Sequence, residues 1–165
     1  MAPGWDDADH PACVLGAGGA TRAVLKGLID RGLSEISLTN RTRDRAEGLA
    51  REFGPAIKVY DWDDRGRALQ GCSLLINTTS LGMTGAPPLE LDLAGLRDGA
   101  IVADIVYAPL ETDLLAEARE RGLRAVDGLG MLLHQAVPGF EKWFGVRPEV
   151  TEDLRNRIVA DLEKT

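Results

Sequence analysis

ACVLGAGGAT, residues 12–21, joins a short apolar run to a glycine-rich segment. The apolar run predicts a buried strand, and the sequence after the glycines predicts a helix that reaches about Arg31. Gly16 would let the chain turn sharply, and Gly18 would let the backbone approach a pyrophosphate with no Cβ in the way. The amide groups and positive dipole end of the helix would then face the phosphates. Thr21 stands where the usual pattern has a third glycine, so an ordinary βα loop is the alternative.

The remaining sequence repeats this alternation of apolar runs and helical stretches. Gly32 and the Gly54-Pro55 pair predict helix ends, and Thr42 and Thr112 predict helix starts. The expected strands cover residues 12–15, 35–39, 56–60, 73–77, 100–105 and 123–126. Six strands with helical crossovers predict an α/β fold of the Rossmann type, which is a doubly wound parallel six-stranded sheet with helices on both faces. Its expected strand order is 3-2-1-4-5-6.

The length and composition indicate a single globular unit. We expect a tail over residues 1–11, a dinucleotide-binding domain over 12–150 and a C-terminal helix over 151–165. The net charge of −7 argues against nucleic acid or a membrane as a partner. No apolar run approaches the ~20 residues of a membrane helix, and the polar start is unlike a signal peptide, so we expect a cytoplasmic protein. Cys13 and Cys72 occupy strand-like positions without metal-ligand spacing, which predicts reduced core residues and no metal site.

The end of the second predicted strand reads Asn40-Arg41-Thr42-Arg43-Asp44-Arg45. NAD-binding domains carry Asp or Glu at this place, which accepts a hydrogen bond from the adenosine ribose. Here arginines stand where a 2′-phosphate would lie, so the sequence predicts NADP as the cofactor. Arg41 and Arg45 are four residues apart and would share a helix face, while Thr42 offers a hydroxyl to the same phosphate. The alternative is a solvated basic patch, although arginine is not favoured electrostatically at a helix start.

Five sequence blocks together resemble the C-terminal NADP-binding domain of the shikimate dehydrogenase (shikimate/quinate 5-dehydrogenase) family. They occur in the family's order and cover residues from about 12 to 145. The blocks are VLGAGGA (14–20), NRT (40–42), NTTSLGM (77–83), DIVYAP (104–109) and DGLGMLLHQA (127–136). Other two-domain NADP enzymes with this fold would not be expected to carry the last block.

The resemblance implies a role for each matched position. The pyrophosphate would lie on Gly16, Ala17, Gly18, Gly19 and Ala20, and the phosphorylated adenosine on Asn40, Arg41, Thr42 and Arg45. The cofactor groove would be lined by Asn77, Thr78, Thr79 and Ser80, and the nicotinamide flanked by Ile105 and Gly128 with Met131 close by. Tyr107 and Gln135 would reach the substrate. Without the resemblance, Tyr107 could end a strand with its ring packed, and Gln135 could be a solvated helix residue.

The resemblance also implies a preceding domain, which would supply most substrate contacts and a Lys–Asp pair for proton transfer. The four lysines of this chain lie outside that motif, so we expect no catalytic residue here and a chain that is inactive alone. Leu154, Ile158 and Leu162 form an apolar stripe on the final helix, which would pack towards the preceding domain, fold onto its own domain or form a homodimer surface.

The function that these observations predict is the NADP-binding domain of an enzyme that interconverts 3-dehydroshikimate plus NADPH and shikimate plus NADP. A non-catalytic NADP-binding module or partner subunit is one alternative. A domain of a quinate/shikimate dehydrogenase is another, because the residues that distinguish these substrates would lie mostly in the preceding domain.

Overall fold

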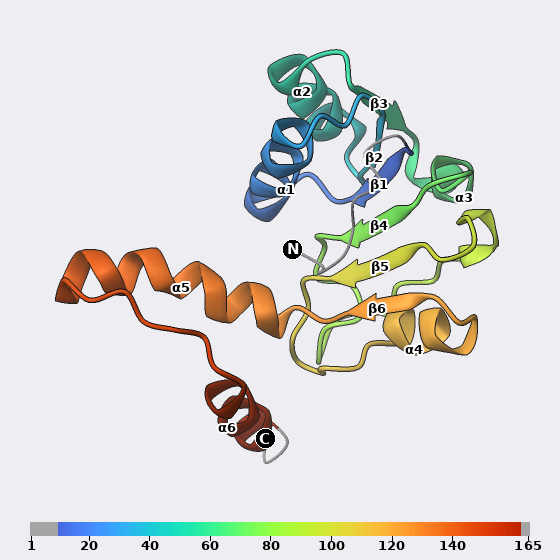
Figure 1. The fold of residues 1–165 in the computed structure, drawn as a ribbon. Coiled ribbons are helices and arrows are strands. Elements are labelled where there is room, and N and C mark those ends of the chain that lie inside the picture. Colours follow the sequence, from blue (N-terminus) through green and yellow to red (C-terminus); the bar gives the residue numbers. More distant parts are fainter. Residues whose placement is uncertain (1–9, 163–165) are drawn as a thin grey trace.

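Short apolar segments form the centre of the protein, which is described by a computed structural model over residues 10–162. They make six parallel strands, β1 (Ala12–Leu15), β2 (Ile36–Thr39), β3 (Ile57–Tyr60), β4 (Leu74–Asn77), β5 (Ile101–Asp104) and β6 (Arg124–Val126). The strands lie in the order β3-β2-β1-β4-β5-β6, which confirms the predicted topology (Figure 1). Each strand end agrees with its predicted position to within one residue. The expectations for residues 1–9 and 163–165 lie outside the described residues.

Helices connect the strands and cover both faces of the sheet (Figure 1). They are α1 (Gly19–Asp30), α2 (Arg43–Phe53), α3 (Arg65–Ala68) and α4 (Asp113–Glu120), with short 3-10 turns η1 (Trp62–Asp64) and η2 (Leu93–Gly95). Two further helices, α5 (Leu129–Phe144) and α6 (Glu152–Leu162), follow the last strand. Strand residues alternate between two cores: Val14 packs with Leu25 and Leu49 of α1 and α2, and Leu15 packs with Leu115 of α4. Burial of each such side chain contributes about 1.5–3 kcal/mol, so helices on both faces stabilise the sheet.

The predicted helix boundaries are confirmed except for one capping bond. The Thr112 hydroxyl accepts a hydrogen bond from Leu115 N at the start of α4, and Gly32 and Gly54 have φ values of 89° and 97° after α1 and α2. Thr42 lies at the N-terminal cap of α2, but its side chain makes no capping hydrogen bond. The Arg45 N–H, from which a capping hydroxyl would accept, donates instead to the backbone carbonyl of Thr42 at 3.1 Å, so Thr42 starts the helix as predicted but without a side-chain cap.

Both cysteines are buried free thiols, as predicted. Cys13 lies in β1, and Cys72 lies two residues before β4. Burial raises the pKa of Cys13, and it raises the pKa of Cys72 to about 12. Both thiols therefore stay protonated at neutral pH and behave as small apolar core residues.

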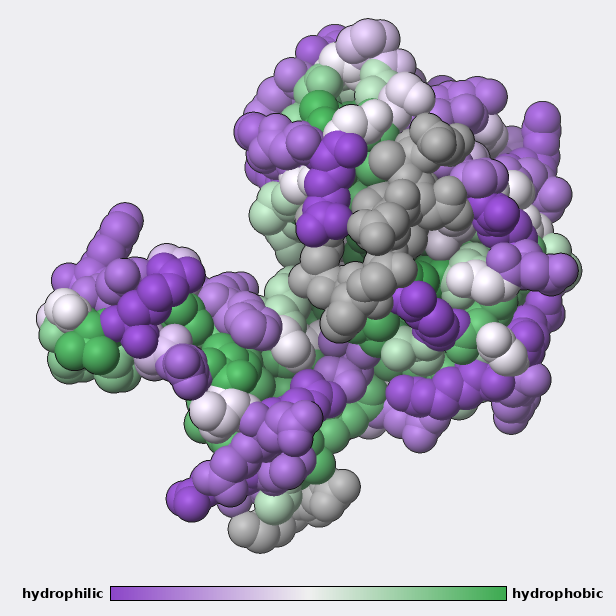
Figure 2. Space-filling model, in the orientation of Figure 1, coloured by the Kyte–Doolittle hydropathy of each residue, from purple (hydrophilic) through white to green (hydrophobic). Residues whose placement is uncertain are grey.

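The last two helices lie outside the layered sheet. α5 begins beside β6 and extends away from the sheet edge, and α6 lies next to it (Figure 1). Apolar residues show on the projecting part of the molecule (Figure 2), where Trp143 is 81% exposed and Phe144 64%. The stripe predicted on α6 is partly covered, since Ile158 and Leu162 are half-buried while Leu154 is exposed. Within residues 10–162, every helix is too short or too polar to cross a lipid bilayer.

Candidate nucleotide-binding site

Most of the predicted site residues lie where strands end at the carboxyl edge of the sheet. Leu15 at the end of β1 is in register with Thr39 of β2 and Asn77 of β4, and Asn77 is in register with Asp104 of β5. Backbone hydrogen bonds extend this pairing beyond the strands, namely Gly16 N to Thr39 O (2.8 Å), Thr78 N to Leu15 O (2.8 Å) and Ile105 N to Asn77 O (3.0 Å). The order of connection reverses between β1 and β4, and ligands of doubly wound sheets bind at this kind of reversal.

The glycine turn leaves open space at the start of α1. Gly16 has a φ of 107°, and a Cβ there would lie 2.7 Å from the Thr78 hydroxyl, so both the conformation and the space require glycine. Within residues 10–162, and apart from the chain neighbours and the backbone of α1, no heavy atom lies within 4 Å of a Cβ built on Gly18 or Gly19. The first turn of α1 carries no acidic residue. The partly positive helix end therefore faces an open surface, which fits the phosphates of a dinucleotide.

Two threonine hydroxyls hold this turn against β4. Gly18 N donates to Thr21 Oγ1 (3.0 Å), and Thr78 Oγ1 donates to Leu15 O (2.6 Å). The hydroxyls of Thr21 and Thr78 are themselves 2.7 Å apart. Because the one hydrogen of Thr78 is used on Leu15, Thr21 donates and Thr78 accepts between them. Thr21, at the position of the usual third glycine, is therefore part of the turn's support, a role that its departure from the glycine pattern could have signalled.

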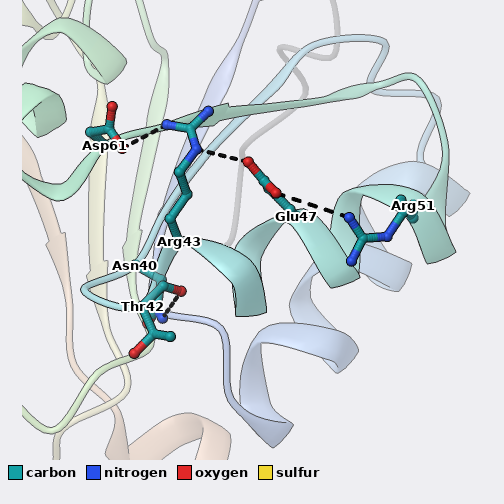
Figure 3. Close-up of polar contacts among 6 residues, drawn as sticks. All are labelled: Asn40, Thr42, Arg43, Glu47, Arg51 and Asp61. Carbon is teal, nitrogen blue, oxygen red and sulfur yellow. Dashed lines mark hydrogen bonds and ion pairs between the residues drawn. The ribbon is translucent and has the colours of Figure 1, made fainter.

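The turn between β2 and α2 is closed by polar contacts (Figure 3). Asn40 Nδ2 donates to Thr42 O at 2.8 Å. Arg43 begins α2 and donates to Glu47 Oε1 (2.8 Å) and to Asp61 Oδ1 (2.6 Å), which lies after β3. These two carboxylates neutralise Arg43 and direct its guanidinium away from the turn. The hydrogen bonds that Arg43 donates to Asp61 and Glu47 also raise the pKa of Arg43, so its charge remains fixed in this contact.

Arg41 and Arg45 differ from Arg43 in their contacts. Both are exposed, and among residues 10–162 neither side chain makes a hydrogen bond or ion pair. Arg41 precedes α2, so the prediction that it shares a helix face with Arg45 is wrong: the helix begins two residues later than the spacing argument requires. Both guanidinium groups nevertheless remain available at one end of α2, where the strand end carries no acidic residue before Asp44.

A buried carboxylate organises the ends of β4 and β5. Asp104 Oδ1 accepts from Asn77 Nδ2 (2.9 Å) and Val106 N (3.0 Å), and its Oδ2 accepts from Thr112 Oγ1 (2.9 Å). Burial raises the pKa of Asp104, while these three hydrogen bonds oppose the rise. The predicted site did not include Asp104, although an Asp that ends an apolar strand is a signal for a buried polar contact.

The groove residues predicted after β4 differ in their burial and in their hydrogen bonds. Asn77 is fully buried, and its Oδ1 accepts from both the backbone N (3.0 Å) and the hydroxyl (2.7 Å) of Thr79. Asn77 therefore shapes the loop with its side chain, whereas Ser80 is exposed. That these residues line a cofactor groove stays a prediction.

Ile105 and Gly128, the two residues predicted to flank the nicotinamide, lie in direct contact. Gly128 N donates to Val106 O at 3.1 Å, and a Cβ on Gly128 would lie 2.6 Å from that oxygen and closer still to Ile105 O. Tyr107 follows Ile105 by two residues and Met131 follows Gly128 by three, and each side chain is 38% exposed. Gln135 is exposed on α5. Their proposed contacts with cofactor or substrate stay predictions.

Comparison with known proteins relates this arrangement to a family. Residues 5–83 match the model described as shikimate / quinate 5-dehydrogenase, and residues 128–154 match that of the shikimate 5′-dehydrogenase C-terminal domain. Shikimate dehydrogenase (NADP+) of Azorhizobium caulinodans is 60% identical over 161 residues, which is 98% of this chain. The chain belongs to the shikimate/quinate 5-dehydrogenase family. It spans 57% of the length of that relative, so a little over half.

Solved structures of the family share the fold. A shikimate 5-dehydrogenase from Thermus thermophilus, in complex with NADP(H) and shikimate, matches with a TM-score of 0.71 and 36% identity. A quinate dehydrogenase from Corynebacterium glutamicum, in complex with NAD, matches with a TM-score of 0.78 and 30% identity. Each match covers 85% of this chain and 51% of the other. Members with this fold thus include complexes with either dinucleotide, and the choice for this chain depends on its own residues.

Proposed function

We propose that this chain is the NADP-binding part of a shikimate dehydrogenase, which converts 3-dehydroshikimate and NADPH to shikimate and NADP. The observation that carries the proposal is the contrast among three arginines at the end of β2. Arg43 is neutralised by Asp61 and Glu47, while Arg41 and Arg45 have no ionic partner within residues 10–162. Two exposed guanidinium groups at a strand end without an acidic residue suit a 2′-phosphate and disfavour the unphosphorylated ribose.

The glycine turn and the arginines bind different parts of the cofactor. Gly16, Ala17, Gly18, Gly19 and Ala20 hold the pyrophosphate at the start of α1, and Asn40, Arg41, Thr42 and Arg45 hold the phosphorylated adenosine. A hydrogen bond to a charged group contributes roughly 1.5–3 kcal/mol, so two such contacts give on the order of 10²-fold preference for NADP over NAD.

The carboxyl ends of β4, β5 and β6 hold the reactive end of the cofactor. The nicotinamide, which carries the hydride, is bordered by Ile105, Gly128 and Met131, with Asn77, Thr78, Thr79 and Ser80 along the groove. Tyr107 and Gln135 contact the substrate. The direct contact of Ile105 with Gly128 supports this placement because it brings the ends of β5 and β6 together.

These 165 residues bind NADP without turning over shikimate. Reduction of a carbonyl requires a proton donor, and the described lysines are engaged or exposed: Lys26 pairs with Asp30, Lys58 lies over the Tyr60 ring, and Lys142 is exposed on α5. The donor and most substrate contacts come from a substrate-binding domain, with residues 12–150 as the nucleotide domain. α6 (Glu152–Leu162) and the exposed aromatic residues of α5 face that complementing domain or a second copy of this chain.

Calorimetric titration with NADP+ and NAD+ tests the proposal. Wild type should bind NADP+ at least tenfold more tightly than NAD+, and the Arg41→Ala/Arg45→Ala double variant should lose most of that preference. Arg51→Ala is the matched control, because Arg51 lies on the same helix, is exposed, and reaches Glu47 only at 4.0 Å. Equal affinity of wild type for both dinucleotides, or an equal effect of Arg51→Ala, would sink the role of Arg41 and Arg45.

A further inference from the structure

An ion pair joins the last helix of the chain to the turn that begins α5. Arg155 Nη2 of α6 lies 2.6 Å from Asp127 Oδ2, although 28 residues separate them in sequence. The side chain of Asp127 is 21% exposed and that of Arg155 36%, so the contact is better shielded from water than most ion pairs of this surface. The second oxygen of Asp127 accepts from Leu129 N at 3.0 Å. The Asp127 carboxylate therefore accepts a hydrogen bond from the first residue of α5 and pairs with Arg155 of α6.

This carboxylate lies next to the contact that places α5 on the sheet. Asp127 directly precedes Gly128, and Gly128 lies against the backbone of Ile105 and Val106. The turn from β6 to α5 is therefore held by the sheet on one side and by α6, through Arg155, on the other. α6 has no fully buried residue, so the half-buried Ile158 and Leu162 act together with this ion pair to hold it.

We propose that Arg155 is a positioning residue for the nicotinamide end of the cofactor, acting through Asp127 on the turn that carries Gly128; this rests on the proposed function. Arg155 does not contact the cofactor. It fixes the conformation of the turn, so the nicotinamide meets a preorganised surface, whereas the adenosine end is held by β2 and α2, far from α6 in the fold (Figure 1).

Two ligands separate this positioning role from a general effect on stability. NADP+ has both ends, whereas adenosine 2′,5′-bisphosphate has the phosphorylated adenosine and lacks the nicotinamide. Arg155→Met should weaken NADP+ binding by roughly 2- to 30-fold and leave the bisphosphate unchanged. Asp127→Asn, which keeps an oxygen for Leu129 N, should do the same, and the double variant should be no worse than either single variant.

Arg157→Met is the matched control, because Arg157 pairs with Asp153 within α6 and both side chains are over three-quarters exposed. It should leave both affinities unchanged, and Arg155→Lys should recover part of the NADP+ affinity. Unchanged NADP+ affinity in Arg155→Met, equal weakening of both ligands, or the same effect from Arg157→Met would overturn the inference. Failure of wild type to bind either ligand would overturn the proposed function, and this inference with it.

Discussion

Gly128 illustrates how one missing Cβ sets the geometry of the site. Its φ of −76° is open to any residue, so glycine is required here by space and not by conformation. The atoms that a Cβ would meet are the carbonyl oxygens of Ile105 and Val106. Backbone atoms of a strand end cannot rotate away as a side chain could, so a substitution must displace α5 or the β5 loop.

Gly128→Ala is expected to lower the free energy of unfolding by about 1–3 kcal/mol and to weaken NADP+ binding. Urea unfolding and calorimetry measure the two effects. Gly139→Ala is the control on the same helix, because no described residue outside its own helix backbone and chain neighbours lies within 4 Å of its Cβ position. Alanine there is neutral or stabilising by up to about 1 kcal/mol. Equal stability of the two variants would contradict the close approach at Gly128.

Between elements, Asp104 is the residue that ties strand ends to a helix. It accepts hydrogen bonds from Asn77 in β4 and from Thr112, which precedes α4. Its folded-state pKa is raised above the ordinary value of 3.8, chiefly by burial. The folded protein therefore keeps this proton to a higher pH than the unfolded chain does. As pH rises from 3.8 through the folded pKa, this group lowers the free energy of unfolding.

Asp104→Asn should remove that contribution, because the amide keeps one oxygen for Asn77 and Val106 and does not ionise. Urea unfolding of wild type and variant, compared at successive pH values above 3.8, measures the difference in slope. Wild type should lose stability relative to Asp104→Asn as pH rises. Parallel curves would show that the carboxyl titrates alike in the folded and unfolded states.

The elements themselves could be predicted because each depends on local sequence. Strand runs, helix-ending glycines and the cap at Thr112 are all encoded within a few residues, and the strand order follows from the regular βα alternation. Contacts between distant residues could not be predicted in this way. Arg43 is distinguished from Arg41 and Arg45 by its contacts with Glu47 and Asp61, and Asp61 lies 18 residues further along the chain. The bond from Thr21 to Thr78 likewise spans 57 residues.

For the whole molecule, the exposed apolar residues are concentrated on one projecting helix. Trp143 is 81% exposed, and Phe140, Phe144 and Val146 are also exposed at or just beyond the end of α5. Surfaces of this kind mark contacts with other protein segments. The fluorescence of Trp143 reports whether a second copy of the chain covers these residues in solution.

At low protein concentration, Trp143 should emit at long wavelength and be quenched readily by iodide. A Trp5→Phe background leaves Trp62 and Trp143 as the emitting residues. In that background Trp143→Phe should remove the accessible component, since Trp62 is only half-exposed. Fluorescence titration of the two proteins measures this. A Trp143 signal that resists iodide at every concentration would mean that the helix end is covered in the isolated chain.

The meeting of Gly128 with the sheet also gives α5 the properties of a lever. Its 16 residues span about 24 Å, so a tilt of about 10° at the base carries the far end through about 4 Å. The pivot is Gly128, which lies against the carbonyl groups of Ile105 and Val106. The part that moves most is the far end of α5, which carries the exposed Trp143 and Phe144. A small change in the backbone contact at Gly128 would therefore move the exposed aromatic residues at the far end of α5 by several times that amount.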